Sequence, residues 1–580
     1  MNNYLKIIIV IVVAITAGLI LYNITPEMDY GIYTGLLELE IEGKTIEIPF
    51  HFIIGKDSVA NVTKVDIYID ERPLSITIET PAIKELKLGR TFNITVSITG
   101  LEKGSTPLCR LRISTPSGHD LPYTPTSVVE NKVNFTVKIL YKTKTASFIF
   151  ASSIVLFASA SLVPFVLTSI YLTIAMYLTG VIGLADPFQL YMSDICLVFL
   201  AGSALELVLR NTGLAERVAS ILKRVSTSPS KLFLSVFVIS GFISMWMSNT
   251  STTYLMLPIV MTLLSILGIE NTALQELVLV GLAVGTTAGG IGTIVGTPPN
   301  LIATGYINKN IYGQDVITFS TWLIWGVPLF VLRVLIAFIL FLVMYQIMGK
   351  HEKAVILNKF HGITSEHEAR PWSREEILGL AGSLFIALMW LTEQYHGVKT
   401  GVAGMIGLLV FLALGVLKPR QVKDLGWDIV ILMGGGLTLG RGLMDTGFSD
   451  YLASTLTTFV EQPLIAMWLL AFISLFIGTI ISSHTAAAAF LAPIMGPIGM
   501  SMARFLGIST TLGGALSVLI STLALDFAVA LPISTPPSAI VYGTGKVRLK
   551  TLFIFGILWG IIGTSLMLLI TPTIVISVLG

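Results

Sequence analysis

Residues 247–259 read MSNTSTTYLMLPI and residues 482–494 read SSHTAAAAFLAPI, so one pattern, polar and then apolar, occurs twice in the chain. Each copy is followed by a Thr-Pro-Pro segment, GTPPNLIATG at 296–305 and STPPSAIVYG at 534–543. Proline lacks a backbone donor and pushes the preceding residue out of helical geometry, so no helix continues unbroken through either segment. The sequence therefore predicts two helix breaks that follow two polar motifs.

A third pair extends the match, with DICLVFLAGSALELVLRNTG at 194–213 and DIVILMGGGLTLGRGLMDTG at 428–447. The copies lie 234 to 238 residues apart, so the repeat contains almost no insertions. Apolar segments that glycine and proline interrupt at corresponding places in two halves are the best sequence indication of a secondary transporter's binding site. We therefore interpret the chain as a membrane carrier.

The composition agrees with a membrane protein. Of the 580 residues, 54% are hydrophobic and 12% are charged, and the mean hydropathy is +0.84. A soluble domain has roughly 25% charged residues, so most of this chain is expected in the lipid bilayer. The net charge of +2 gives no argument for nucleic-acid binding. Cys109 lies in a polar region and Cys196 in an apolar one, so no disulfide is expected, and no Cys or His spacing is typical of a metal site.

The chain begins with an apolar run at 7–22, slightly shorter than the roughly 20 residues of a spanning helix. A signal peptide is the alternative, but no small-x-small cleavage site follows the run. We therefore expect residues 1–22 to form an uncleaved transmembrane anchor.

Residues 23–145 differ in character, because apolar and polar residues alternate in stretches such as FNITVSITG and VNFTVKILY. Glycine, proline and asparagine separate these stretches, which predicts an antiparallel β-sandwich. Glycosylation sequons begin at Asn61, Asn93 and Asn134 and fit an extracytoplasmic domain, although a Thr-rich stretch also produces sequons by chance.

The rest of the chain consists of apolar segments with short connections. We expect a first transporter repeat at 146–348, a cytoplasmic linker at 349–377 and a second repeat at 378–580. Membrane crossings are expected near 148–164, 166–186 and 192–210, with a last one near 551–575.

Corresponding loops of the two repeats carry opposite charge. The loop after the third crossing is basic, with Arg210, Arg217, Lys223, Arg224 and Lys231. Its counterpart at 447–463 contains Asp450 and Glu461 but no Lys or Arg. Because basic loops stay in the cytoplasm, the two repeats are expected to be inverted, with the β domain and the C-terminus extracytoplasmic.

The polar motifs offer uncharged oxygens and N–H groups, which avoid the cost of burying a charge in the membrane and suit a site that must release its ligand. At the tip of a re-entrant hairpin, the N–H groups of a helix start would face an anion. Carbonyls opened by a Thr-Pro-Pro break can coordinate Na⁺ where they line a cavity. A locally satisfied helix kink is the alternative for one copy, but it does not explain two motifs that occur twice in the same order.

At these motifs the chain resembles the divalent anion/sodium symporter family, the carriers of dicarboxylates, citrate and sulfate. The resemblance covers about residues 147–580 and is strongest at four motifs: Ser248-Asn249-Thr250, GTPPN ending at Asn300, LPISTPPS ending at Ser538, and WLTE at 390–393. It implies an all-α polytopic membrane protein with two inverted repeats, re-entrant hairpins and broken helices, to which this chain adds the N-terminal β domain. It also implies a homodimer in the bilayer that moves a small anionic substrate by an elevator motion.

The resemblance assigns site residues by position. It implies substrate contacts for Ser248, Asn249, Thr250, Thr297, Pro298, Ser483, His484, Thr485, Thr535 and Pro536. It implies a first sodium ion at Ser244, Ser248, Asn249 and Gly296, and a second at Thr479, Ser482 and Ser534. The second site departs from the family, because His484 stands where the family has asparagine and Asp526 stands where a small polar residue is usual.

An imidazole can place a positive charge where a cation would otherwise bind, and a nearby carboxylate can stabilise that charge. We hypothesise that His484, paired with Asp526, replaces the second sodium ion. The carrier would then be proton-coupled, an exchanger, or coupled to fewer sodium ions. The alternative is a neutral His484 that donates one hydrogen bond to the substrate.

Other charged residues are expected to be structural. Glu206, Arg210, Arg441 and Asp445 lie near predicted helix ends, where interfacial positions or pairing across helices are expected. No hydrolase triad or nucleotide-binding motif occurs, so no enzyme activity is expected. Two other functions stay open: an arsenite or sodium/proton antiporter with similar broken helices, and a membrane receptor whose β domain binds a ligand.

Overall fold

The computed structural model describes residues 3–579 apart from short stretches, most of them in loops. The stretches left out are 29–30, 42–43, 70–71, 87–90, 100–107, 115–119, 124–126, 130–131, 139, 141, 160–161, 183–185, 271, 348–370, 450 and 453–461. Most of the predicted linker at 349–377 therefore lies outside the described residues. Asp450 and Glu461, the acidic residues of the loop at 447–463, also lie outside them.

The described chain divides into two compact units. Met1–Val155, Ile174–Leu184 and Arg441–Glu461 form the first unit, and Leu156–Thr173, Ala185–Gly440 and Gln462–Gly580 form the second.

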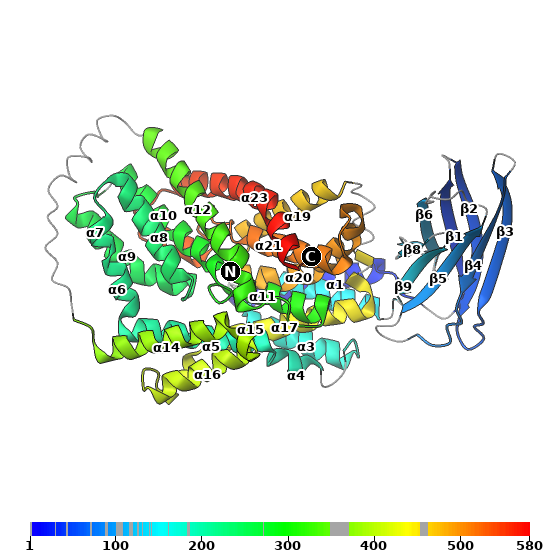
Figure 1. Cartoon of the computed structure of the whole chain (residues 1–580), viewed down its shortest axis with the longest axis horizontal. Helices are drawn as coiled ribbons and strands as arrows, with labels where there is room; N and C mark the ends of the chain where they lie inside the picture. Colours follow the sequence, from blue (N-terminus) through cyan, green and yellow to red (C-terminus); the bar gives the residue numbers. More distant parts are fainter. Residues whose placement is uncertain are drawn as a thin grey trace. The chain divides into compact units, whose positions relative to one another are not determined.

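The first unit contains the predicted β domain, which Figure 1 shows in blue as two sheets. Its strands are β1 (Gly31–Ile41), β2 (Lys44–Ile54), β3 (Asn61–Ile69), β4 (Arg72–Thr80), β5 (Thr91–Thr99), β6 (Leu108–Ser114), β7 (Asp120–Tyr123), β8 (Ser127–Val129) and β9 (Lys132–Lys138). One sheet has the order β2-β1-β6-β7 and the other β3-β4-β5-β9-β8. All neighbouring strands are antiparallel, as the alternating sequence predicts.

Alternation along each strand builds the core of this domain. In β5, the side chains of Phe92, Ile94, Val96 and Ile98 are buried, while the residues between them are exposed or half-buried. Successive side chains of a strand point to opposite faces, so each apolar series lines one side of its sheet. These residues join Tyr33 and others in a single apolar cluster.

The chain enters and leaves the β domain at one place. Helix α1 (Asn3–Ile24) precedes the domain and helix α2 (Thr143–Ala158) follows it. The Met28 amide donates to the Leu140 carbonyl at 2.7 Å, and the Thr143 hydroxyl donates to the Pro26 carbonyl at 2.5 Å. The β domain is therefore an insertion between two apolar helices.

The rest of the described chain is helical (Figure 1). Its elements are α3 (Phe165–Leu178), α4 (Asp186–Tyr191), α5 (Asp194–Thr212), α6 (Leu214–Ser220), α7 (Leu222–Val225), α8 (Pro229–Ser244), α9 (Asn249–Ile266), α10 (Ala273–Gly289), η1 (Gly290–Gly292), α11 (Pro298–Tyr306), η2 (Ile307–Tyr312), α12 (Phe319–Ile347), α14 (Arg374–Leu391), α15 (Glu393–His396), α16 (Thr400–Ala413), η3 (Pro419–Asp424), α17 (Trp427–Thr446), α19 (Pro463–Ile480), α20 (His484–Met502), η4 (Ala503–Leu506), α21 (Thr510–Leu525), α22 (Pro536–Gly543) and α23 (Leu549–Leu579).

Among the described residues, six helices are long and apolar enough to cross a membrane, including α1, α12 and α23. The first three crossings predicted after the β domain correspond to α2, α3 and α5, but two of them end earlier than predicted. Helix α2 ends at Ala158, well before Pro164. Helix α3 ends at Leu178, shortly before Gly180, whose φ of 66° is left-handed and terminates helices.

Each polar motif lies at a short turn between two helices. Helices α8 and α9 flank the first motif, and α19 and α20 flank the second. The Ser248 hydroxyl accepts from the Ser251 amide at 3.3 Å, and the Ser483 hydroxyl accepts from the Ala486 amide at 3.2 Å. Both serines thus act as N-caps and start the second helix of their pair.

Each Thr-Pro-Pro segment separates two helices, and the sequence predicts these breaks. The first break lies between α10 and α11, and the second lies between α21 and α22. In both copies proline takes the first helical position, where its missing donor leaves no bond unmade. Helix α9 packs against α22 and α11 packs against α20, so each copy's hairpin contacts the other copy's broken helix.

Candidate functional site

The first polar turn and the first helix break approach each other closely. The Ser244 hydroxyl donates to Asn249 Oδ1 at 2.7 Å. A Cβ atom on Gly290 would lie 2.9 Å from the same Asn249 oxygen and 3.4 Å from the Gly296 carbonyl oxygen. A Cβ on Gly296 would lie 2.5 Å from the Gly290 carbonyl oxygen, so this approach depends on residues without side chains.

Asn300 holds the first break in shape. Its Nδ2 donates to the carbonyls of Gly290 at 2.9 Å and Thr293 at 3.0 Å. Its Oδ1 is buried and has no hydrogen-bond partner among the described residues.

The first polar turn and the first helix break together offer a set of oxygen ligands. Ser244, Asn249 and Gly296 bring hydroxyl, amide and carbonyl oxygens together, which are ligands that a hard cation such as Na⁺ accepts.

The second polar turn also contacts its helix break. The Ser534 hydroxyl donates to the Thr479 carbonyl at 2.8 Å and accepts from the Leu531 amide at 3.1 Å. Ser482, the third residue assigned to the second sodium site, is exposed, and none of its hydrogen bonds is recorded. Of the three residues, Thr479 and Ser534 are therefore the two that a hydrogen bond joins among the described residues.

The two Thr-Pro-Pro threonines differ in their hydrogen bonding. The Thr535 hydroxyl donates to the Ser538 hydroxyl at 2.9 Å and accepts from the Ser538 amide at 3.2 Å. Thr297 occupies the same position before α11, but its side chain makes no capping bond. The sequence gives the two threonines equivalent positions. In the structure, the Thr535 hydroxyl caps its helix and the Thr297 hydroxyl does not.

His484 and Asp526, predicted as a pair, are neighbours. His484 Nδ1 lies 4.0 Å from Asp526 Oδ1, and Nε2 lies 3.2 Å from the Gly478 carbonyl oxygen. The carboxylate is almost fully buried, and its Oδ2 has no hydrogen-bond partner among the described residues. Both ring nitrogens of His484 thus face protein oxygens, so donation to a substrate would require the ring to turn.

Arg333 of α12 is a buried charge that the sequence interpretation missed. Its side chain is 1% exposed, donates to the Leu523 carbonyl at 3.1 Å and lies 4.2 Å above the Phe527 ring. It also interacts electrostatically with the Asp526 carboxylate. The available signal was a lone arginine in the apolar run FVLRVLIAF, because an ionisable residue inside a spanning helix is a functional-site hypothesis by default.

Glu206 of α5 contacts the first polar motif, a partner that the sequence interpretation did not name. Its Oε2 accepts from the Ser248 amide at 3.1 Å, and its Oε1 accepts from the hydroxyls of Ser248 at 3.2 Å and Ser251 at 2.5 Å. Glu206 thus pairs across helices, one of the two arrangements expected for it, and its partner is the first polar motif. Arg441 and Asp445 pair at 2.7 Å, but within α17 rather than across helices.

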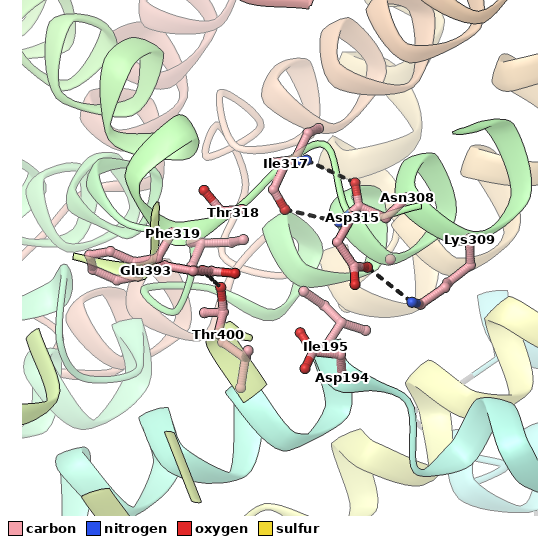
Figure 2. A pocket seen from close by; sticks show the side chains of 13 residues that line it. Asp194, Ile195, Asn308, Lys309, Asp315, Ile317, Thr318, Phe319, Glu393 and Thr400 are labelled. Carbon is pink, nitrogen blue, oxygen red and sulfur yellow. Dashed lines mark hydrogen bonds and ion pairs between the residues drawn. The ribbon is translucent and has the colours of Figure 1, made fainter. Parts of the chain in front are cut away.

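A polar pocket lies where α5, α16 and the η2–α12 connection meet (Figure 2). Asp315 accepts from Lys309 at 2.9 Å and from Lys399 at 3.0 Å. Partial burial acts to raise the pKa of Asp315, but the two lysines hold that pKa below its ordinary value. Glu393, from the WLTE motif, accepts a hydrogen bond from Thr400, and burial raises its pKa. None of the predicted substrate residues lines this pocket.

The predicted substrate residues thus fall into two groups, one at each hairpin. Among the described residues, no recorded hydrogen bond joins the turn at Ser248–Thr250 directly to the turn at Ser483–Thr485. What connects the two groups is the packing of α9 on α22 and of α11 on α20.

Comparisons with known proteins give the class of this protein. A family model described as "Sodium:sulfate symporter transmembrane region" matches residues 138–578. A sodium-dependent dicarboxylate transporter, SdcS, of Staphylococcus saprophyticus is 28% identical over 72% of this chain and 83% of its own. An uncharacterized transporter of Haemophilus influenzae is 31% identical over 70% of this chain and 84% of its own.

Among solved structures, the YdaH transporter of Alcanivorax borkumensis aligns with 13% identity and a TM-score of 0.44 over 66% of this chain and 86% of that one. This similarity is too low to define the fold.

These findings define a multi-pass membrane transporter and not an enzyme. The chain belongs to the sodium:sulfate symporter family, which is the divalent anion/sodium symporter family that its motifs resemble.

Proposed function

We propose that this protein is a secondary active transporter that couples the uptake of a small divalent anion, a di- or tricarboxylate or sulfate, to Na⁺. The observation that carries the proposal is a polar hairpin tip next to a Thr-Pro-Pro helix break, present twice in a chain of this family. Helix starts supply N–H groups for an anion, and opened helices supply carbonyls for a cation. The family's description and the relatives' names mention sodium with sulfate or dicarboxylate.

In this proposal the substrate binds at the residues assigned above, centred on Ser248–Thr250, Thr297, Ser483–Thr485 and Thr535. The first sodium ion binds at Ser244, Ser248, Asn249 and Gly296, where the neutral oxygens converge. The opposite charge of corresponding loops supports inverted repeats with re-entrant hairpins.

Two clusters support the proposed orientation. The starts of α5, α12 and α16 share the pocket of Figure 2, as expected if all three ends are extracytoplasmic. Arg548 pairs with Glu276 at 2.7 Å near the starts of α23 and α10, which are both proposed to be cytoplasmic. The β domain at 23–145, with any glycosylated sequons, and the C-terminus would then be extracytoplasmic. A homodimer with an elevator motion completes the proposal by family resemblance.

A second coupling mode is favoured by the contact between His484 and Asp526. If this pair takes the place of the second sodium ion, the carrier is an exchanger, is proton-coupled or uses fewer sodium ions. The 4.0 Å distance supports this mode, since a carboxylate beside an imidazole stabilises the protonated ring, and Asp526 Oδ2 still has no hydrogen-bond partner among the described residues. The antiporter alternative predicts no anion uptake, and the receptor alternative predicts ligand binding at the β domain.

The test is uptake of labelled succinate, citrate and sulfate into proteoliposomes under an inward Na⁺ gradient. Wild-type protein should accumulate at least one of these anions only when Na⁺ or a pH gradient is present. Thr250→Val should raise the KM roughly tenfold, because hydrogen bonds to a charged group contribute about 1.5–3 kcal/mol. Thr262→Val, on the exposed side of the same helix α9, should leave KM unchanged. No uptake of any of the three anions by the wild type would reject the proposal.

A further inference from the structure

The Glu206 carboxylate accepts hydrogen bonds at the start of α9, where the proposed function places the substrate. Three donors from the start of α9, the Ser248 amide and the hydroxyls of Ser248 and Ser251, all reach this one side chain. Charged hydrogen bonds to a helix N-terminus are among the stronger ones in proteins. In this structure a group of the protein therefore occupies the first hairpin tip in the way that a substrate carboxylate would.

Within the part of the chain that the structure describes, no cationic side chain pairs with this carboxylate. Among the described residues, no ion pair involves Glu206, and its recorded partners are the two serines alone. The hydroxyls and the positive end of the α9 dipole are therefore its counter-charge. An anionic substrate would find the same groups already satisfied.

The second copy of the repeat lacks such a group. In the matched pair of segments, Glu206 aligns with Gly440, and a Cβ at Gly440 would lie 2.6 Å from the Tyr306 ring. A carboxylate is thus present at only one of the two repeated positions. The fold of the repeat does not itself require a carboxylate there.

We propose that Glu206 is a tethered carboxylate that competes with the anionic substrate for the tip of the α8–α9 hairpin. The proposal rests on the proposed function. When the substrate's carboxylate or sulfate oxygens bind the Ser248 amide and hydroxyl, Glu206 leaves them. Its occupancy of the tip lowers the apparent affinity for substrate, because only the fraction of molecules with a vacated tip can bind.

The packing gives this exchange a mechanical consequence. Helix α5 packs on α16, α14 and α11, whereas the hairpin α8–α9 packs on α10 and α22. Glu206 therefore adds a polar link between α5 and the tip of the α8–α9 hairpin. Substrate binding breaks this link, so the hairpin tip is held to α5 only while it carries no anion.

The experiment compares Glu206→Gln with the wild type by measuring the KM for succinate and for sulfate in proteoliposomes and the Kd of the same anions by calorimetry. Glutamine keeps the size of the side chain but cannot compete as an anion, so KM and Kd should fall about tenfold. Ser251→Ala removes one donor to Glu206 without changing the net charge, so it should also lower KM, by about threefold. Glu216→Gln, an exposed glutamate of α6, has the same charge change and should leave both constants unaltered.

An increase in KM and Kd for Glu206→Gln, or no change, would overturn the proposal, because Glu206 would then brace the tip or have no part in binding. Should Glu206→Gln fail to fold, Ser251→Ala decides by the same criterion. If the wild type itself neither binds nor transports succinate or sulfate while remaining folded, the proposed function fails for these anions, which is distinguishable from failure of the competition alone.

Discussion

At the scale of single residues, the buried charges decide how the carrier can be coupled. Arg333, Asp526 and His484 lie together in a region where other buried polar groups are neutral hydroxyls and amides. Burying a lone charge is costly, so groups of this kind persist where they balance each other or a transported ion. With Arg333 as the fixed cation, the Asp526 carboxylate is counterbalanced whether or not His484 carries a proton.

From this arrangement we expect His484→Asn to change the coupling rather than the substrate preference. Asparagine restores a neutral amide beside the Thr479 carbonyl and the Ser534 hydroxyl, which meet at 2.8 Å. Sodium activation of succinate uptake should become steeper, with a Hill coefficient rising from about 1 to about 2, because that coefficient is limited by the number of sites. The measurement is uptake against Na⁺ concentration at several pH values.

The matched control is His51→Asn, an exposed histidine of the β domain, which should behave as the wild type. A sodium dependence and pH profile in His484→Asn that equal those of the wild type would remove His484 from the coupling mechanism.

The sequence could reveal His484 and Asp526 because both depart from a recognisable motif. Their 4.0 Å separation could not be derived, since it depends on how α20 packs on α21. Arg333 lies on α12, outside the motifs, and Glu206 lies in the repeated segment 194–213 of α5. Position along a helix does not tell which neighbour either side chain reaches. Pairing across helices was expected for Glu206, but its partners could not be named, since they lie over 40 residues later in the chain.

At the scale of elements, the contact between the first hairpin and the first broken helix depends on glycine. A Cβ on Gly289, the last residue of α10, would lie 2.0 Å from the Gly241 carbonyl oxygen of α8. The obstacle is backbone, which cannot rotate away as a side chain can. Helices α8 and α10 therefore pack with their backbones in contact, and this packing places the Ser244–Asn249 bond next to the break.

We expect Gly289→Ala to destabilise the protein by about 1–3 kcal/mol, because inserted atoms in a packed interior force the backbone apart. Transport should fall with it, since α8 would move away from the break. Gly543→Ala is the matched control: Gly543 is the last residue of α22, and a Cβ added there would meet nothing within 4 Å. Thermal unfolding of both variants in detergent, with succinate uptake, measures the difference. Equal unfolding temperatures for the two variants would contradict the backbone contact.

The helix breaks themselves were predictable, because proline and glycine act locally. The close packing of α8 on α10 was not, since the glycines at 281, 285 and 289 also fit an unbroken apolar helix. The strands of the β domain followed from alternation, yet their order in two sheets did not, because β1 pairs with β6 across 66 intervening residues from Gly31–Ile41 to Leu108–Ser114.

At the scale of the whole molecule, the β domain is built as an insertion. It has its own apolar core, and the chain enters and leaves it where Met28 pairs with Leu140. Insertions whose ends lie close together can be removed with little effect on the chain around them. The family match begins at residue 138, where the β domain ends, so the transporter region is defined without it.

Replacing residues 29–139 by a short Gly-Ser linker should therefore leave succinate uptake within about twofold of the wild type, because closing a short loop costs little. A receptor whose β domain binds the ligand predicts loss of the response.

A second variant separates absence of the β domain from its misfolding. Ile94→Asp places a charge in the core of the domain in an otherwise full-length chain. Burial raises the pKa of the Cys109 thiol to about 12, so maleimide at pH 8 should label it only in Ile94→Asp. Loss of uptake in the deletion variant, with its helices still folded, would assign the β domain a direct part in transport.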